Sequence, residues 1–310
     1  MRFLQRHYYH YAIAMGAGLV VALLGRFVFA SKSFANAGGL LMLCFLVLIP
    51  MALGAITAHF TPTWASYTSR AVVGPFSTVL LFLTTALLFQ LEGMICVLII
   101  FPLFLFTSWL GALLYLLFTK DKSDDNRTYT VAVFALLPFL LAPLESQLTT
   151  PDDYRRVENS IVIHAPAAVV WQHIIRVPPI QAQDLGPSLV DDIGFPRPVE
   201  ATLSHEGVGG VRRATFERGV EFIETVDLWE PQRKLSFSIV PNTATIPPTT
   251  FDEHVTVGGR FFDVLRGTYE LQPAGPGRTR LVLYSQQRLS TRLNPYAGLW
   301  TDYVMSEIQR

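Results

Sequence analysis

Glu224 is the residue whose surroundings point most clearly to chemistry. It lies between Phe222 and Val226 in a run that alternates as a β-strand does, so the three side chains share one face. If this face is the inner one, the carboxyl group is desolvated, its pKa rises, and it can act as a general acid or base. Two alternatives stay open: an internal salt bridge, with Arg213 as the candidate partner, or a reversed register that exposes Glu224.

Polar and aromatic groups on later segments extend this predicted site. Ser285 and Gln287 share one face of the last expected strand, where they could bind a ligand or satisfy backbone groups. Tyr269 presents a phenol at an apolar wall, and Trp300 and Tyr303 belong to a C-terminal apolar stripe expected to pack helix against sheet. The predicted ligand contacts are Phe222, Glu224, Phe237, Tyr269, Ser285, Gln287, Trp300 and Tyr303.

The sequence carries no metal or cofactor signature. Its seven histidines form neither His-x-His nor His-Glu-x-x-His, and no Cys-x-x-Cys occurs. Nucleophile-elbow, phosphate-loop and dinucleotide-binding motifs are also missing from the sequence. The formal net charge is zero, so no basic footprint for nucleic acid is visible. We therefore expect no cofactor, no metal and no nucleic-acid partner.

Charge is unevenly distributed along the 310 residues. Residues 8–148 contain few charged side chains, whereas residues 150–310 have an ordinary soluble composition. This asymmetry predicts a transmembrane region at 1–148, a polar linker at 149–156 and a globular domain at 157–310. About five membrane-spanning helices are expected, at 11–30, 39–58, 72–91, 94–118 and 129–147.

The positions of lysine and arginine predict the orientation of these helices. With five spans, Arg2, Arg6, Arg70 and the basic loop 120–127 share one side, which should be the cytoplasm. The globular domain then lies on the non-cytoplasmic side of a bacterial inner or plasma membrane. If the run at 129–147 does not cross, the domain is cytoplasmic instead.

Two charged residues lie close to the apolar runs. Arg26 is expected to extend its guanidinium to the interface, and Glu92 with Gly93 is expected to form a turn between spans. An intramembrane carboxylate could instead serve transport. The sequence shows no array of intramembrane charges, however, so we expect this region to be an anchor or scaffold.

The globular half begins with a change of period. Ile161 and Ile163 alternate with polar neighbours as in a strand, and Pro166 then opens an amphipathic helix that contains Trp171. Further strands are expected at 199–205, 211–217, 220–228, 235–239, 253–257, 261–272 and 279–288, followed by a helix from Pro295. The connecting turns are short, which favours an antiparallel sheet.

Six segments of this half carry a resemblance to a known superfamily: Ile161-Val-Ile-His-Ala-Pro-Ala-Ala-Val-Val-Trp171, Gly207-Val-Gly-Gly-Val-Arg-Arg213, Trp229-Glu-Pro-Gln-Arg-Lys-Leu-Ser-Phe237, Gly267-Thr-Tyr-Glu-Leu271, Thr279-Arg-Leu-Val-Leu-Tyr-Ser285 and Asn294-Pro-Tyr-Ala-Gly-Leu-Trp300. In order and spacing they are similar to the SRPBCC (START-like, helix-grip) superfamily, of the polyketide cyclase/dehydrase and lipid-transport type. The resemblance implies a curved antiparallel sheet that grips a C-terminal helix around an apolar cavity. The last helix is expected to be short for that superfamily.

The predicted fold is therefore an α-helical membrane bundle followed by an α+β helix-grip domain. We expect a membrane-anchored domain that binds a hydrophobic small molecule or lipid, because tethering to the bilayer concentrates such ligands near the cavity. Two alternatives stay open: a cyclase/dehydrase-type enzyme with Glu224 as general acid or base, and a structural domain whose interior is filled by side chains. The identity of the ligand and the oligomeric state are left open.

Overall fold

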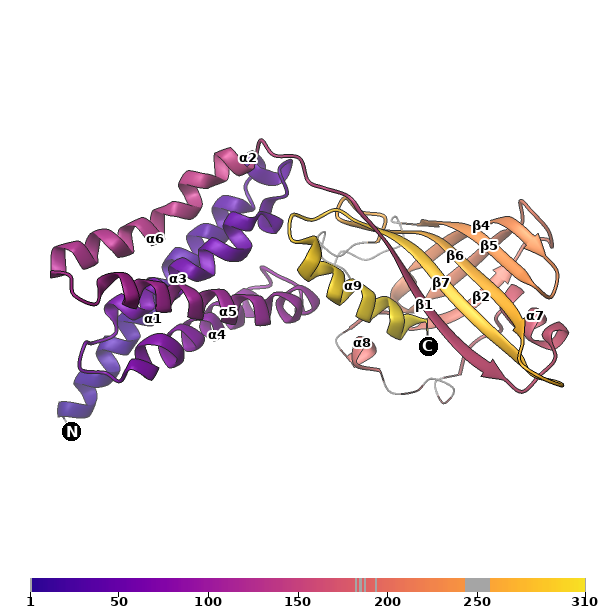
Figure 1. Ribbon diagram of the computed structural model, residues 1–310, viewed down its shortest axis with the longest axis horizontal. Coiled ribbons are helices and arrows are strands. Elements are labelled where there is room, and N and C mark those ends of the chain that lie inside the picture. The colour runs from indigo at the N-terminus through magenta and orange to yellow at the C-terminus, as the bar shows by residue number, and fades with distance from the viewer. Residues whose placement is uncertain are drawn as a thin grey trace. The chain divides into compact units, whose positions relative to one another are not determined.

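The chain folds into two compact units (Figure 1). The computed structural model describes residues 2–181, 183, 186, 188–192, 194–242 and 257–309, with only the backbone of residues 2–8. The first unit comprises Met1–Pro151 together with Thr291–Leu293, and the second comprises Asp152–Ser290 together with Asn294–Arg310. Neither unit is therefore a continuous piece of chain.

The first unit is helical. Its helices are α1 (Arg2–Phe29), α2 (Lys32–Ala35), α3 (Ile49–Phe60), α4 (Gly74–Leu88), α5 (Met94–Thr119) and α6 (Asp124–Glu145). Short π-helical turns, Cys44–Leu48 and Ser69–Val73, lead directly into α3 and α4, and a 3₁₀ turn spans Gly39–Leu41.

Four helices of the described chain are long and apolar enough to cross a membrane: Tyr9–Phe29, Ser69–Leu88, Met94–Thr119 and Asp124–Glu145. The span expected at 39–58 differs, because only Cys44–Phe60 forms a continuous apolar helix. Gly38 and Gly39 both adopt positive φ, a conformation that ends a right-handed helix. The run expected at 129–147 is a full helix despite two internal prolines, which neighbouring groups can accommodate in membrane helices.

Helix α3 is the central helix of the first unit and packs against α1, α4, α5 and α6. Small residues allow its backbone to approach that of α5. A Cβ added to Gly54 would lie 1.8 Å from the Ser108 carbonyl oxygen, and one added to Gly111 would lie 2.1 Å from the Met51 carbonyl oxygen. Such close packing through small residues is typical of membrane helices.

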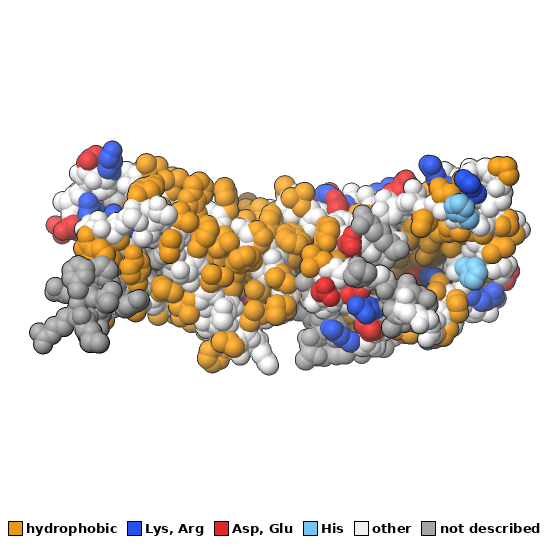
Figure 2. Space-filling view, turned by 90° about the horizontal axis from the view of Figure 1, so that it is seen from below, with side chains coloured by type: hydrophobic (Ala, Val, Ile, Leu, Met, Phe, Trp, Pro, Cys, Tyr) orange, Lys and Arg blue, Asp and Glu red, His pale blue; other side chains and the backbone are white. Residues whose placement is uncertain are grey.

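Large apolar side chains cover the outside of this unit, including Val20, Leu88, Phe106, Leu136 and Leu140 (Figure 2). An apolar surface of this extent is a liability in water and suits a bilayer.

Arg26 and Glu92 form an ion pair in the first unit. Arg26 Nε lies 2.5 Å from Glu92 Oε1, and both side chains are largely buried. Arg26 also donates a hydrogen bond from Nη2 to the Leu91 carbonyl oxygen (2.6 Å). Glu92 lies in the connection between α4 and α5, where a turn was expected, but its carboxylate is paired and not simply solvated. Arg26 is therefore paired within the protein.

The second unit is built on one seven-stranded antiparallel sheet. Its strands are β1 (Asp153–Ile163), β2 (Pro198–Leu203), β3 (Val211–Phe216), β4 (Glu221–Glu230), β5 (Lys234–Pro241), β6 (Phe262–Pro273) and β7 (Thr279–Leu289). The order across the sheet is β1-β7-β6-β5-β4-β3-β2. The strand expected at 253–257 lies, apart from Val257, outside the described residues.

Strand β1 begins inside the segment expected to be a linker, because Asp153 and the residues after it already pair with the end of β7. Register shifts between Val226 and Leu228, and between Val264 and Arg266, mark bulges that help a sheet to bend. The result is a curled sheet with a concave face (Figure 1).

Within the described residues, the α-helices that accompany the sheet are α7 (Ala167–Ile175), α8 (Leu189–Asp192) and α9 (Asn294–Ile308). The apolar stripe of α7 buries Val170, Trp171, Ile174 and Ile175 in a core cluster with Val226, Leu235, Phe237 and Leu271 from β4, β5 and β6. This core occupies one part of the concave face. Helix α9 lies along β1 and also contacts β7 and α8.

Candidate functional site

Two charged residues, Arg212 and Glu224, lie opposite each other on neighbouring strands of the concave face. The register of the β3–β4 hairpin pairs Arg212 directly with Glu224. Arg212 Nη1 donates a hydrogen bond to Glu224 Oε2, and both side chains are less than one-tenth exposed. Directly opposed residues of an antiparallel pair point to the same side of the sheet, so the hairpin itself creates this contact.

Burial and pairing act in opposite directions on Glu224. Burial raises the pKa of its carboxyl group above the ordinary value, and the Arg212 guanidinium opposes that rise. For Arg212, burial lowers the pKa, but Glu224 and the nearby Tyr269 phenol more than offset this effect. Because a guanidinium stays charged in proteins, loss of the Glu224 charge would leave an unpaired buried cation. The geometry therefore favours the ion pair at neutral pH.

Aromatic side chains surround the Arg212 guanidinium. Its Cζ lies 5.5 Å from the centroid of the Phe237 ring, and its guanidinium also hydrogen-bonds the Tyr269 phenol. Burial raises the pKa of Tyr269, while the guanidinium lowers it. The Phe237 and Tyr269 rings are 6.0 Å apart and tilted. Arg212, Glu224, Phe237 and Tyr269 thus form one polar group within an apolar wall, which we call the Arg212 group.

The concave face beside this group is not completely filled by side chains. Tyr269, Ile239 and Leu281 pack against the α7 core, yet each remains partly accessible. Figure 2 shows the second unit hollowed on the face that it displays, with hydrophobic side chains on the walls. An apolar hollow with a few placed polar groups is the usual form of a small-molecule site.

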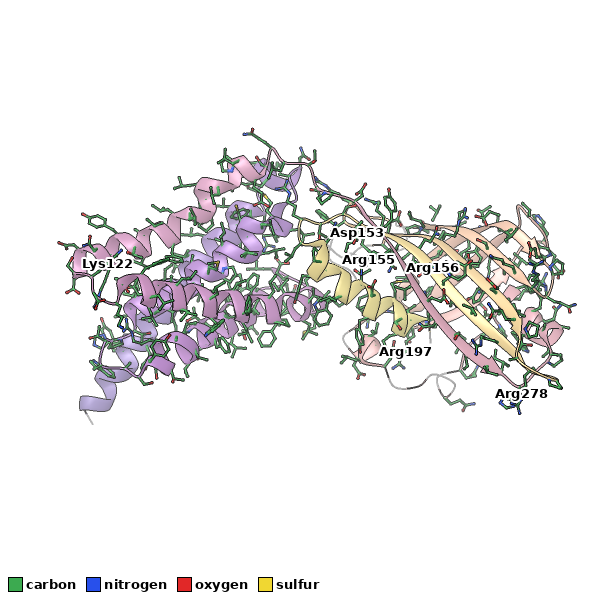
Figure 3. All side chains as sticks on the ribbon, in the orientation of Figure 1. Lys122, Asp153, Arg155, Arg156, Arg197 and Arg278 are labelled. Carbon is green, nitrogen blue, oxygen red and sulfur yellow. The ribbon has the colours of Figure 1, made fainter. Side chains whose placement is uncertain are left out.

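Arg155 fixes α9 to β1. Arg155 Nε donates to Asp302 Oδ1 (2.9 Å), Nη2 donates to Asp302 Oδ2, and Nη1 donates to Asp153 Oδ2 (2.9 Å). These hydrogen bonds raise the pKa of Arg155. Gly298 makes room for the guanidinium, because a Cβ there would lie 2.7 Å from it. Figure 3 labels Arg155 and Asp153 on this strand.

A second set of hydrogen bonds holds the end of α9. Asn159 Nδ2 donates to the Ser306 carbonyl oxygen (2.8 Å), and Ser306 Oγ donates to Asn159 Oδ1 (3.2 Å). Gln309 Nε2 donates to Ser285 Oγ (2.7 Å). Ser285, predicted as a ligand contact, is therefore occupied with positioning the helix.

Gln287 is fully buried on β7, between Arg155 of β1 and Val264 of β6 in the register. Neither Nε2 nor Oε1 of its amide has a hydrogen-bond partner within the described part of the chain. Arg212 Nε is also buried without a hydrogen-bond partner among the described residues. Leaving a buried polar group unsatisfied costs about 1–3 kcal/mol, so both groups require an explanation.

The other predicted contacts lie farther from the Arg212 group. Phe222 packs edge-on against Phe216, with ring centroids 5.2 Å apart. Trp300 and Tyr303 lie on α9, where Trp300 is partly buried and Tyr303 is 39% exposed. The structure brings Glu224, Phe237 and Tyr269 together and does not bring Tyr303 to them.

Sequence reasoning missed Arg212 and named its neighbour as the partner of Glu224. Arg213 lies on the opposite face, is exposed, and contacts Glu221 at 3.3 Å. Residues on a strand alternate between faces, so an error of one position moves a side chain to the other side. Among the residues that the structure describes, no group of three or more His, Cys, Asp or Glu could hold a metal ion.

No protein-family model matches the sequence, and neither does any curated protein. Among solved structures, the chain is similar to DynU16, a putative protein of the dynemicin biosynthetic locus, at 22% identity and a TM-score of 0.27, over 51% of this chain and 47% of that one. The chain therefore spans about half the length of DynU16.

Two further similarities concern proteins with named activities. The Zhui aromatase/cyclase from Streptomyces sp. R1128 shows 16% identity and a TM-score of 0.31, over 51% of this chain and 90% of that one. A truncated norcoclaurine synthase from Thalictrum flavum shows 14% identity and a TM-score of 0.30, over 53% and 92%. Scores this low carry no argument about function, which must come from the geometry of the second unit.

Proposed function

We propose that the second unit binds a hydrophobic small molecule or lipid on the concave face of its sheet, as a START-like, helix-grip domain. The observation that carries this proposal is a pair of buried polar groups, Arg212 Nε and the Gln287 amide, which have no partner among the described residues. A bound ligand would supply hydrogen-bond partners for both groups and remove the free-energy cost of burying them unpaired. The partly accessible apolar side chains around Tyr269 supply a surface for its hydrophobic body.

The chemistry of these groups defines the class of ligand. Glu224 already neutralises Arg212, so the free Nε–H suits an uncharged acceptor such as a carbonyl or hydroxyl oxygen. The Gln287 amide both donates and accepts, which suits a hydroxyl or amide group. Arg212 lies on β3 and Gln287 on β7, with β6, β5 and β4 between them in the sheet, so the two polar groups are separated across the strands.

These groups suit an apolar ligand that carries oxygen-bearing groups at two positions. The proposal includes the first unit as a bilayer anchor in a bacterial inner or plasma membrane. If Cys44–Phe60 crosses as well as the four longer helices, the second unit lies on the non-cytoplasmic side. A reporter fused after Arg310 tests this orientation by its activity on one side or the other.

Ligand retention by Gln287 variants tests the proposed binding. Full-length protein is purified in mild detergent, and bound small molecules are extracted and identified by mass spectrometry. Gln287→Leu removes both unpartnered amide atoms at similar volume and should reduce retention about fivefold to thirtyfold, because it removes about one to two hydrogen bonds worth roughly 1 kcal/mol each. The matched control is Gln286→Leu, since Gln286 is exposed on the other face of the same strand.

Two results would count against binding. The first is wild-type protein that carries no small molecule above the level of the detergent blank. The second is equal retention by Gln287→Leu and Gln286→Leu, which would place the ligand elsewhere.

A second candidate function is acid–base catalysis of the cyclase/dehydrase kind. The observation that favours it is the contact of two titratable groups, the buried Glu224 and the partly buried Tyr269, with one guanidinium, which is the kind of environment that tunes acids and bases. Under this function, Tyr269→Phe abolishes turnover of the extracted compound or its analogues while retention stays within a few-fold. A parallel loss of retention would assign Tyr269 to binding alone.

A further inference from the structure

A basic cluster lies at one end of the first unit, where four helical segments begin or end. His59 is at the end of α3, Arg70 is in the π-helical turn before α4, Tyr115 is near the end of α5, and Arg127 is in the first turn of α6. His59 Nδ1 and the Tyr115 hydroxyl share a hydrogen bond of 2.7 Å. Arg70 and Arg127 interact electrostatically with each other and with Tyr115. We call these four residues the Arg70–Arg127 cluster.

The positive charges of this cluster are only partly compensated. Arg70 Nη2 donates to the Ala58 carbonyl oxygen at 3.3 Å, and Arg127 Nη1 lies 3.7 Å from Oδ1 of Asp124, whose side chain is fully exposed. The Nε atoms of both arginines are buried and have no partner in the described parts of the chain. Two guanidinium groups that approach each other in a partly buried site repel unless an anion lies between or beside them.

Exposed aromatic residues near this cluster suit a position at the level of lipid headgroups. Trp64, Tyr67 and Tyr129 are exposed close to it in the chain, and tryptophan and tyrosine gather at membrane–water interfaces. Lys120 and Lys122 lie in the adjacent α5–α6 loop and are exposed (Figure 3 labels Lys122). Figure 2 shows charged side chains at this end of the unit, beyond its hydrophobic surface.

We propose that the Arg70–Arg127 cluster binds the phosphate of an anionic phospholipid. A guanidinium presents two parallel N–H groups to phosphate oxygens, and each orphaned Nε–H can form one such pair with a neighbouring Nη. The hydrogen-bonded Tyr115 and His59 border the same site. Basic pockets between transmembrane helices suit acidic headgroups, and the neighbouring apolar helix surfaces accept acyl chains. Inorganic phosphate shares the headgroup chemistry but lacks the chains.

Native mass spectrometry of the full-length protein tests this site. Detergent-solubilised wild type is titrated with phosphatidylglycerol, with phosphatidylcholine of the same chains, and with inorganic phosphate. Wild type should bind phosphatidylglycerol about tenfold or more tightly than phosphatidylcholine, since a hydrogen bond to a charged group contributes about 1.5–3 kcal/mol and 1.4 kcal/mol is tenfold. Arg127→Gln should remove this preference, whereas Arg127→Lys should keep part of it.

Lys122→Gln is the matched control, because it removes one positive charge from an exposed position in the adjacent α5–α6 loop and should leave the preference intact. Arg70→Gln is a second test of the cluster, but it also removes the hydrogen bond from Arg70 to the Ala58 carbonyl oxygen at the end of α3. If Arg70→Gln fails to fold for that reason, Arg127→Gln decides the test. Equal affinity of wild type for the two phospholipids would overturn the site, as would an unchanged preference in Arg127→Gln. If inorganic phosphate binds as tightly as phosphatidylglycerol, and if Arg127→Gln abolishes that binding, the cluster recognises free phosphate and the lipid proposal is overturned.

Discussion

Replacing Glu224 with glutamine should destabilise the β3–β4 hairpin strongly, because it leaves the Arg212 charge buried without its counter-ion. Both side chains are less than one-tenth exposed, so water cannot replace the lost carboxylate. Breaking such a pair by removing one partner costs about 3–5 kcal/mol. That is a large fraction of the roughly 5–15 kcal/mol that stabilises a typical domain.

Removing both charges should cost far less. The double variant Arg212→Met, Glu224→Leu fills a similar volume with apolar atoms next to Phe237, and replacements of this type are often neutral or stabilising by about 1–4 kcal/mol. The comparison therefore distinguishes a pair that contributes net stability from one that is retained for another reason. Near-normal stability of the double variant together with loss of ligand retention would indicate a binding role.

Hydrogen exchange of the full-length protein measures the effect locally, which avoids assuming one unfolding transition for two units. Amides in peptides that cover β3 and β4 should exchange roughly 100-fold to 4,000-fold faster in Glu224→Gln, since each 1.4 kcal/mol changes an equilibrium constant tenfold. In the double variant they should exchange within about tenfold of wild type. Unchanged exchange in Glu224→Gln would refute the reasoning, because it would mean that the pair is not buried in solution.

Two further predictions concern other features of the chain. Gly267→Ala should destabilise the sheet by about 1–3 kcal/mol, seen as faster exchange in β5 and β6, because its Cβ would lie 2.6 Å from the Phe237 ring. Arg292→Met should destabilise the first unit by about 3–5 kcal/mol, seen as a lower thermal inactivation temperature in detergent, because it leaves the Glu145 carboxylate buried and unpaired.

The hairpin that creates the Arg212–Glu224 pair shows how far sequence reasoning reaches. Both strands and the Arg218-Gly219 turn could be recognised, and the structure gives both turn residues positive φ. Counting outward from a two-residue Arg218-Gly219 turn matches position 224 with 213, whereas the structure centres the hairpin on residue 218 and matches 224 with 212. The turn is a three-residue one, Glu217–Gly219, and this one extra residue sets the register that the sequence pattern did not reveal.

Contacts between distant parts of the chain could not be predicted in this way. Glu145 accepts hydrogen bonds from the backbone N–H groups of Leu43 and Cys44, and it pairs with Arg292 at 3.0 Å. Nothing local in the sequence near Glu145 indicates either contact. The interior position of Gln287 follows from the strand pattern, but its unpartnered amide depends on packing by α9 and β6, which only the structure shows.

The return of Thr291–Leu293 to the first unit has a consequence for biosynthesis. Arg292 donates hydrogen bonds to the carbonyl oxygens of Glu145 and Leu148, and 147 residues separate it from Glu145. At about 5–20 residues per second, roughly 7–30 s pass between the synthesis of the carboxylate and that of its cation. During this interval the helical bundle holds a carboxylate without its counter-ion, so the unit that is made first is among the last to be completed. A chain cut after Pro151 should preserve that unfinished state.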